Sequence, residues 1–176
     1  MDLFETIQKR QSVRAYHSKG IEPAKLDALL GAVNQAPSAG NLQARQVIVV
    51  RDEATRRALA RASLGQDFIS QAPVALVFCA DAARAATKYG KRGREFYSVQ
   101  DATIAASYAQ LAATALGLAT CWVGAFEEKE VVAVLGLRAD LRPVAILPVG
   151  YAAESPRRTP RRALGEVVLE HAPTRT

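Results

Sequence analysis

The side chains of this sequence that could do chemistry begin near its N-terminus, where charged and hydroxyl groups alternate. The segment from Arg10 to Tyr16 places Arg10, Ser12 and Arg14 at every second position. In an extended segment these three side chains project to one side. Two guanidiniums and a hydroxyl on one side can hold a phosphate and neighbouring hydroxyl groups, because a guanidinium binds phosphate through two hydrogen bonds. The alternative is an exposed turn with ordinary surface arginines.

The net charge of +6 is concentrated in two basic clusters. The sequence has no helix-turn-helix or zinc-finger spacing that would assign them to nucleic acid. We interpret the first cluster as a solvated basic face and the second as the partner of an anionic cofactor or substrate. The first cluster is Arg84, Lys88, Lys91, Arg92 and Arg94, and the second is Arg157, Arg158, Arg161 and Arg162.

Familiar catalytic templates are missing. The sequence has no P-loop, no G-x-G-x-x-G after a strand, no G-x-S-x-G elbow and no H-E-x-x-H. His17 and His171 are too few for a metal site, so we expect none. Cys79 and Cys121 lie far apart in apolar runs, which predicts buried free thiols. A chain of this kind either is not an enzyme or takes its chemistry from a cofactor.

The apolar pattern predicts helices that alternate with strands. Strands that are apolar throughout imply a sheet covered by helices on both faces, hence a layered α/β or α+β domain. In the first helix, Phe4 and Ile7 are expected on the inner side. We expect helices at residues 2–9, 23–33, 53–62, 98–116 and 127–135, and strands at 47–50, 74–80, 119–123 and 144–149.

The length fits one domain, residues 1–176, with a core at 1–153 and a C-terminal arm at 154–176. Alanines on several faces of the 98–116 helix predict a central helix that lies at a subunit interface. The apolar run Val167-Val168-Leu169 in the arm has no obvious partner within such a domain. No membrane-spanning run or signal peptide is expected, so the protein is predicted to be cytoplasmic.

Short motifs in order along essentially the whole chain resemble the FMN-dependent nitroreductase family. The first is R-x-S-V-R-x-Y at residues 10–16, and Asp101 opens the alanine-rich helix. The others are Ala36–Gln43, Gln71-Ala72-Pro73, Gly117–Phe126, Pro148–Tyr151 and Pro160–Leu164.

The resemblance implies an α+β fold with a central, mostly antiparallel sheet flanked by helices. It also implies an intertwined homodimer that exchanges C-terminal arms and binds FMN at the interface. Arg10, Gln11 and Ser12 would lie at the FMN phosphate, with Arg161 or Arg162 adding a second charge from the arm. Arg14 would sit near the flavin N1/C2=O edge, where a cation favours reduction.

Two further segments would complete the cofactor site. Pro37, Ser38, Ala39, Gly40 and Asn41 would come from the other protomer, with Asn41 offering its amide to the cofactor. The backbone N–H of Gly124 would reach flavin N5 or O4, next to Val123. Trp122 would either touch the cofactor or belong to the core.

The resemblance also implies a reaction. NAD(P)H would pass a hydride to flavin N5 and leave, and an electron-accepting small molecule such as a nitroaromatic or quinone would take its place, giving ping-pong kinetics. Tyr89, Phe96 and Tyr97 would form a lid over the substrate pocket. Alternatives are a flavin-fragmenting or dehalogenating enzyme of the same fold and a basic nucleic-acid-associated protein without cofactor.

Overall fold

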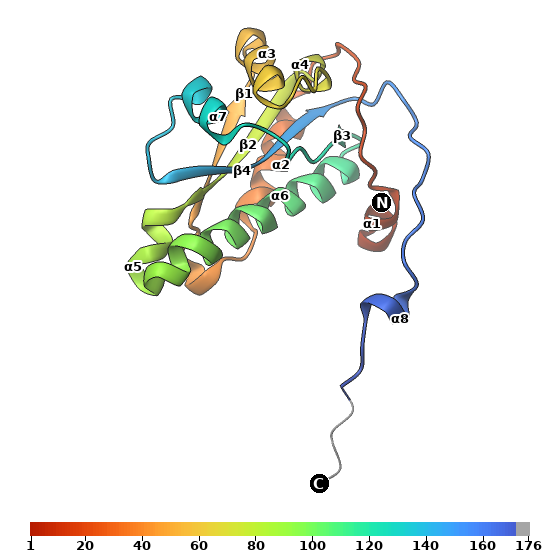
Figure 1. Cartoon of the computed structure of the whole chain (residues 1–176). Helices are drawn as coiled ribbons and strands as arrows, with labels where there is room; N and C mark the ends of the chain where they lie inside the picture. Colours follow the sequence, from red (N-terminus) through yellow and green to blue (C-terminus); the bar gives the residue numbers. More distant parts are fainter. Residues whose placement is uncertain (172–176) are drawn as a thin grey trace.

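Four antiparallel strands form the sheet at the centre of the molecule, in the order β1-β2-β4-β3 (Figure 1). The computed structural model describes residues 1–171. The strands are β1 (Arg45–Val50), β2 (Val74–Asp81), β3 (Ala119–Thr120) and β4 (Leu141–Gly150). The helical elements are α1 (Leu3–Lys9), α2 (Pro23–Asn34), η1 (Ala39–Asn41), α3 (Glu53–Ala62), α4 (Phe68–Gln71), α5 (Ala82–Arg92), η2 (Gly93–Tyr97), α6 (Ser98–Ala115), α7 (Glu128–Leu135) and α8 (Leu164–Val167).

Helices cover both faces of the sheet, as the apolar strands predict. Leu76 and Phe78 of β2 pack with α2 and α6 on one face, whereas Val77 and Cys79 pack with α3, α4 and α7 on the other. Successive side chains of a strand point to opposite faces, and both faces of this sheet are covered by helices. Every residue of β2 is therefore buried. The α+β class and the mostly antiparallel sheet are therefore confirmed.

Two strand predictions need correction. The 47–50 run was expected to be a buried strand, but β1 lies at the edge of the sheet and only Val50 in it is buried. The strand expected at 119–123 ends at Thr120. Val123 then meets Ile146 of β4 through an isolated bridge. An edge strand and a two-residue strand look the same as a full strand in an apolar sequence pattern.

The first helix also departs from expectation. Asp2 caps α1 by accepting a hydrogen bond from the Glu5 backbone N–H at 2.8 Å. The side chain buried against the body is Thr6, whereas Phe4 is 75% exposed and Ile7 50% exposed. The prediction that Phe4 and Ile7 face inward is therefore wrong for a single chain, because α1 packs through its polar side.

The C-terminal arm leaves the body after β4 and passes α1 before extending away (Figure 1). Val167 closes the short helix α8, and Val168 and Leu169 belong to no helix or strand. Pairing of this run with the sheet of a second copy stays a prediction, and residues 172–176 of the predicted arm lie outside the described part. Within residues 1–171 no helix is long and apolar enough to cross a membrane.

Candidate functional site

The segment 10–16 is held in an extended form by its apolar members. Val13 is buried and its N–H donates to the Thr120 carbonyl at 3.0 Å, next to a parallel bridge between Ser12 and Thr120. The buried Tyr16 hydroxyl donates to the Val13 carbonyl at 2.7 Å. With Val13 turned inward, Arg14 is left exposed.

The C-terminal arm folds back along this segment. The Ala153 N–H donates to the Ala15 carbonyl at 2.9 Å, and the Arg14 N–H donates to the Glu154 carboxylate. Farther along, Arg158 Nη2 donates to the Gln8 carbonyl at 2.7 Å. In the amide orientation that satisfies both of its polar ends, Gln11 also bridges the arm, with its N donating to Pro156 O at 3.0 Å and its O accepting from Arg158 Nε at 3.2 Å.

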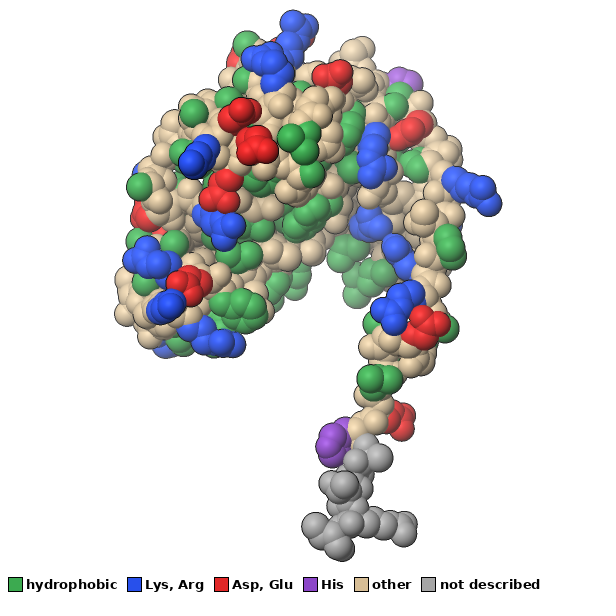
Figure 2. Space-filling model, viewed as in Figure 1, with side chains coloured by type: hydrophobic (Ala, Val, Ile, Leu, Met, Phe, Trp, Pro, Cys, Tyr) green, Lys and Arg blue, Asp and Glu red, His purple; other side chains and the backbone are tan. Residues whose placement is uncertain are grey.

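The two segments enclose a cavity of about 540 Å³, which we call the arginine cradle. The hollow between arm and body is visible in Figure 2. Among residues 1–171, five arginines and no carboxylate line the cradle, so its chemistry suits an anion with hydroxyl groups. Its lining residues are Ile7, Gln8, Arg10, Gln11, Ser12, Arg14, Pro156, Arg157, Arg158, Thr159 and Arg161.

The sequence left open whether Arg161 or Arg162 contributes the second charge at the FMN phosphate, and the structure distinguishes the two. Arg161 lines the cradle, whereas Arg162 is paired with Glu166 at 3.1 Å and is not part of the lining. Arg157 and Arg158 also line the cradle, although within the second basic cluster only Arg161 and Arg162 were expected at the FMN phosphate. Their membership of the second basic cluster was the signal that could have identified them.

Cys121 lies beside the cradle. Burial raises the pKa of its thiol, while Arg14, the Ser12 hydroxyl and Arg10 act in the opposite direction. Burial therefore outweighs the two positive charges, and the thiol keeps its proton at neutral pH.

The predicted loop 37–41 is fixed to the start of α6. Asp101, which is buried, accepts hydrogen bonds from the Ala39 N–H at 2.9 Å and the Ala44 N–H at 3.0 Å. Gly40 has φ +56°, and a Cβ there would clash with the Tyr89 hydroxyl and lie 2.9 Å from Lys88 Nζ. The positive φ favours glycine at position 40, and the Tyr89 and Lys88 side chains of α5 lie directly against the loop.

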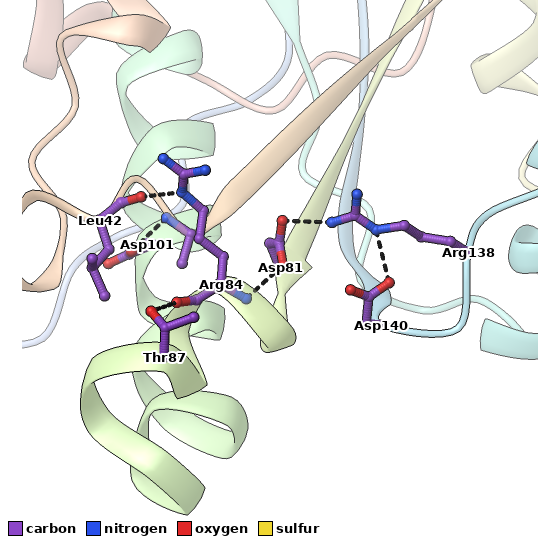
Figure 3. A network of polar contacts seen from close by, with 8 residues as sticks. Leu42, Asp81, Arg84, Thr87, Asp101, Arg138 and Asp140 are labelled. Carbon is purple, nitrogen blue, oxygen red and sulfur yellow. Dashed lines mark hydrogen bonds and ion pairs between the residues drawn. The ribbon is translucent and has the colours of Figure 1, made fainter.

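The three aromatic residues predicted as a lid form one cluster on α5 and η2. The rings of Tyr89 and Tyr97 meet edge to face with centroids 5.1 Å apart, and Phe96 lies 5.9 Å from Tyr97. A network at the base of α5 holds it to its neighbours (Figure 3). Asp81 accepts from the Arg84 N–H at 2.9 Å and from Arg138 Nη2 at 2.6 Å, and Arg84 Nε donates to the Leu42 carbonyl.

The third predicted segment, Trp122 to Gly124, follows β3. Val123 is buried, Trp122 is half-buried against the α2–α6 side of the core, and Gly124 is exposed. A hollow of about 270 Å³ opens beside Gly124 and Val99. The structure thus gives Trp122 a packing role, while the Gly124 backbone stays accessible.

The arginine cradle and the 37–41 loop lie near different parts of α6. The arginine cradle lies near Thr120, which is 3.4 Å from Gln110 Nε2, and the 37–41 loop is bound to Asp101. Asp101 and Gln110 are separated by about 13.5 Å along α6, at 1.5 Å per residue. The cradle and the 37–41 loop therefore lie beside different turns of α6.

Comparison with known proteins assigns the chain to a class. The model of the Nitroreductase family matches residues 7–66 and 62–151. A Thermus thermophilus protein named NADH dehydrogenase is 32% identical, over 92% of each chain. A Bacillus subtilis protein named FMN reductase [NAD(P)H] is 31% identical, over 98% of this chain and 74% of its own length. The solved structure of NfrA2 from B. megaterium superposes with a TM-score of 0.91 at 29% identity, over 98% of this chain and 75% of that one.

The chain belongs to the Nitroreductase family. The resemblance read from the sequence motifs is confirmed, and with it the oxidoreductase class.

Proposed function

We propose that this protein is an NAD(P)H-dependent FMN oxidoreductase that reduces electron-accepting small molecules such as nitroaromatics or quinones. The observation that carries the proposal is the arginine cradle, in which five arginines, a serine and a threonine surround one cavity without a carboxylate. Relatives named FMN reductase and NADH dehydrogenase support the flavin and the nicotinamide donor.

The residues of the cradle fit FMN. Arg10, Ser12 and Arg161 would hold the phosphate, and Gln11 and Arg158 would keep the arm closed over it. A guanidinium pair with a hydroxyl matches a terminal phosphate by charge and by hydrogen-bond geometry.

FMN, when bound, supplies the redox chemistry by accepting a hydride at N5 and giving it up to the acceptor. Arg14 is exposed at the rim of the cradle, where its positive charge favours the reduced cofactor. The Gly124 backbone N–H and the Asn41 amide would bind the ring edges. No side chain has to act as nucleophile, which agrees with a sequence that lacks catalytic templates.

The site is completed by a second copy of the chain, in a homodimer with FMN at the interface. Large apolar side chains on α1, α6 and the arm are exposed in one chain, which leaves a surface suited to burial in a partner. They are Leu3, Phe4, Ile7, Tyr108, Leu164, Val167, Val168 and Leu169.

A screen of electron acceptors with NADH and NADPH tests the proposed function. We expect turnover of nitroaromatics or quinones, with parallel double-reciprocal lines when donor and acceptor are varied together. Turnover that requires oxygen and destroys the flavin would instead identify the flavin-fragmenting alternative. Absence of turnover with every donor and acceptor would contradict the proposal.

A further inference from the structure

The first basic cluster forms a positive surface on α5 and η2, which we call the basic lid. Five cations and one carboxylate give these two elements a net charge of +4. The carboxylate, Glu95, already lies 3.9 Å from Lys91. Figure 2 shows Lys and Arg side chains gathered at this end of the molecule. Such a surface attracts an anionic ligand more strongly than a neutral one.

Arg92 is the best organised cation of the basic lid. Its guanidinium carbon lies 5.0 Å from the Phe96 ring centroid and 5.2 Å from that of Tyr97, and its Nε donates to the Tyr97 hydroxyl at 2.9 Å. Among residues 1–171, no carboxylate lies within ion-pair distance of Arg92, and its two Nη groups make no hydrogen bond. A guanidinium held in this way loses little conformational freedom when it binds a phosphate through both Nη groups.

Lys88 adds a second cation close to the proposed flavin site. A Cβ at Gly40 in the 37–41 loop would lie 2.9 Å from its Nζ. Between Lys88 and Arg92 the helix is interrupted at Gly90, which has φ +52°. In the described part of the chain Lys88 forms no ion pair with a carboxylate, and its Nζ lies 5.5 Å from the centroid of the Tyr89 ring. The basic lid therefore borders the loop that would contact the cofactor.

The base of the lid is fixed. Asp81 caps α5 and is itself bound by Arg138, and Arg84 binds the Leu42 carbonyl (Figure 3). These contacts fix the first turn of α5 beside the 37–41 loop, ahead of the interruption of the helix at Gly90.

We infer that the basic lid binds the 2′-phosphate of NADPH, so that NADPH is preferred to NADH. NADPH differs from NADH only by this phosphate monoester, and Arg92 with Lys88 matches its charge. The exposed face of Phe96 offers an apolar surface for the adenine beside it. A nicotinamide ring placed at the flavin leaves the rest of the dinucleotide to extend across the lid. The inference rests on the proposed function and specifies its donor.

The test compares kcat/KM for NADPH and NADH in the FMN-loaded protein and in Arg92→Gln, Arg92→Lys and Lys88→Met. We expect the native protein to favour NADPH by about tenfold or more, the order of one charge-assisted hydrogen bond. Arg92→Gln should lose most of that preference through a higher KM for NADPH, with little change for NADH. Arg92→Lys should restore only part of it, because an ammonium lacks the planar fork.

Arg61→Gln is the matched control, since Arg61 is an exposed arginine on α3, far from the lid (Figure 1). It should leave the NADPH preference unchanged. Calorimetry supplies a readout independent of turnover: the FMN-loaded protein should bind adenosine 2′,5′-bisphosphate more tightly than 5′-AMP, and Arg92→Gln should remove the difference.

Equal kcat/KM for the two donors, or a preference that Arg92→Gln leaves intact, would overturn the inference and return the lid to a solvated basic face. Those results would leave the proposed function standing, because both donors would still reduce the protein. If neither donor reduces it, the proposed function fails and the inference fails with it.

Discussion

The carboxylate of Asp101, at the start of α6, accepts a hydrogen bond from the backbone N–H of Ala39 at 2.9 Å. The two residues are 62 positions apart in the sequence. The other carboxylate oxygen accepts from the Ala44 N–H at 3.0 Å. One buried side chain thus fixes both ends of the loop that carries Gly40 and Asn41. The loop has a set shape before any ligand reaches it.

Replacing this carboxylate is expected to loosen the loop. Asp101→Asn keeps the volume but leaves one of the two backbone N–H groups facing an amide N–H, and an unsatisfied buried donor costs about 1–3 kcal/mol. We expect a lower free energy of unfolding by that amount, measured in urea, together with weaker FMN retention.

Asp67→Asn serves as the control, because Asp67 is exposed and its side chain makes no capping hydrogen bond. Equal stability of Asp101→Asn and Asp67→Asn would show that Asp101 does not support the loop.

Arg10 and Arg162 should differ in their effect on FMN affinity. Arg10→Ala removes a charge-assisted contact to the phosphate, so Kd for FMN should rise about tenfold to a hundredfold. Arg162→Ala should change it little, because Arg162 is paired with Glu166 outside the cradle. Fluorescence titration of the flavin-free protein measures both values. A larger effect from Arg162 than from Arg10 would place the phosphate elsewhere on the arm.

The two thiols should be unreactive in the folded protein. Cys79 is 0% and Cys121 1% exposed, and burial raises the pKa of Cys79 to about 12 and that of Cys121 above its usual value. Because only the thiolate reacts, iodoacetamide at pH 8 should label neither residue until denaturant is added. Rapid labelling of Cys79 in the native protein would contradict its burial.

The same shifts set a pH dependence of stability. The folded thiols keep their protons above the unfolded pKa of about 8.5, where the unfolded chain releases them. The folded state then binds more protons than the unfolded state, so this contribution to the free energy of unfolding falls as pH rises above about 8.5.

Deleting residues 154–176 should remove dimerisation and flavin retention together. The arm supplies Arg158 and Arg161 to the cradle and exposes Leu164 and Leu169, the latter 84% exposed. We expect a full-length dimer whose interface exceeds about 2,000 Å², as permanent interfaces do. Size-exclusion chromatography with light scattering, combined with visible absorption, measures both properties. A truncated chain that stays folded, yellow and dimeric would rule out the exchanged arm.

Much of the fold follows from local patterns in the sequence. The 74–80 run is apolar at every position, which predicts a strand that is buried on both faces. In the structure β2 is buried throughout. Pro23 and the spacing of Leu26, Leu29 and Val33 likewise predict α2. The position of a strand at the edge of the sheet does not follow from a local pattern, because it depends on which strands pair with one another. For that reason β1 resembles a buried strand in sequence although it lies at the edge.

In the candidate site, too, some features follow from local sequence patterns and others depend on how distant segments meet. Alternation at Arg10, Ser12 and Arg14 was visible in the sequence, and the structure places all three in the cradle lining. The choice between Arg161 and Arg162 depends on the path of the arm, which no local pattern encodes. The outward turn of Phe4 and Ile7 likewise depends on which face of α1 meets the body.

The most direct test of the account is the identity and behaviour of the chromophore in the purified full-length protein. We expect a yellow protein that releases FMN rather than FAD on denaturation, identified by mass spectrometry, and whose visible absorption is bleached by NADPH without oxygen. A colourless protein that fails to bind added FMN would contradict the proposal that this chain is an FMN-dependent oxidoreductase.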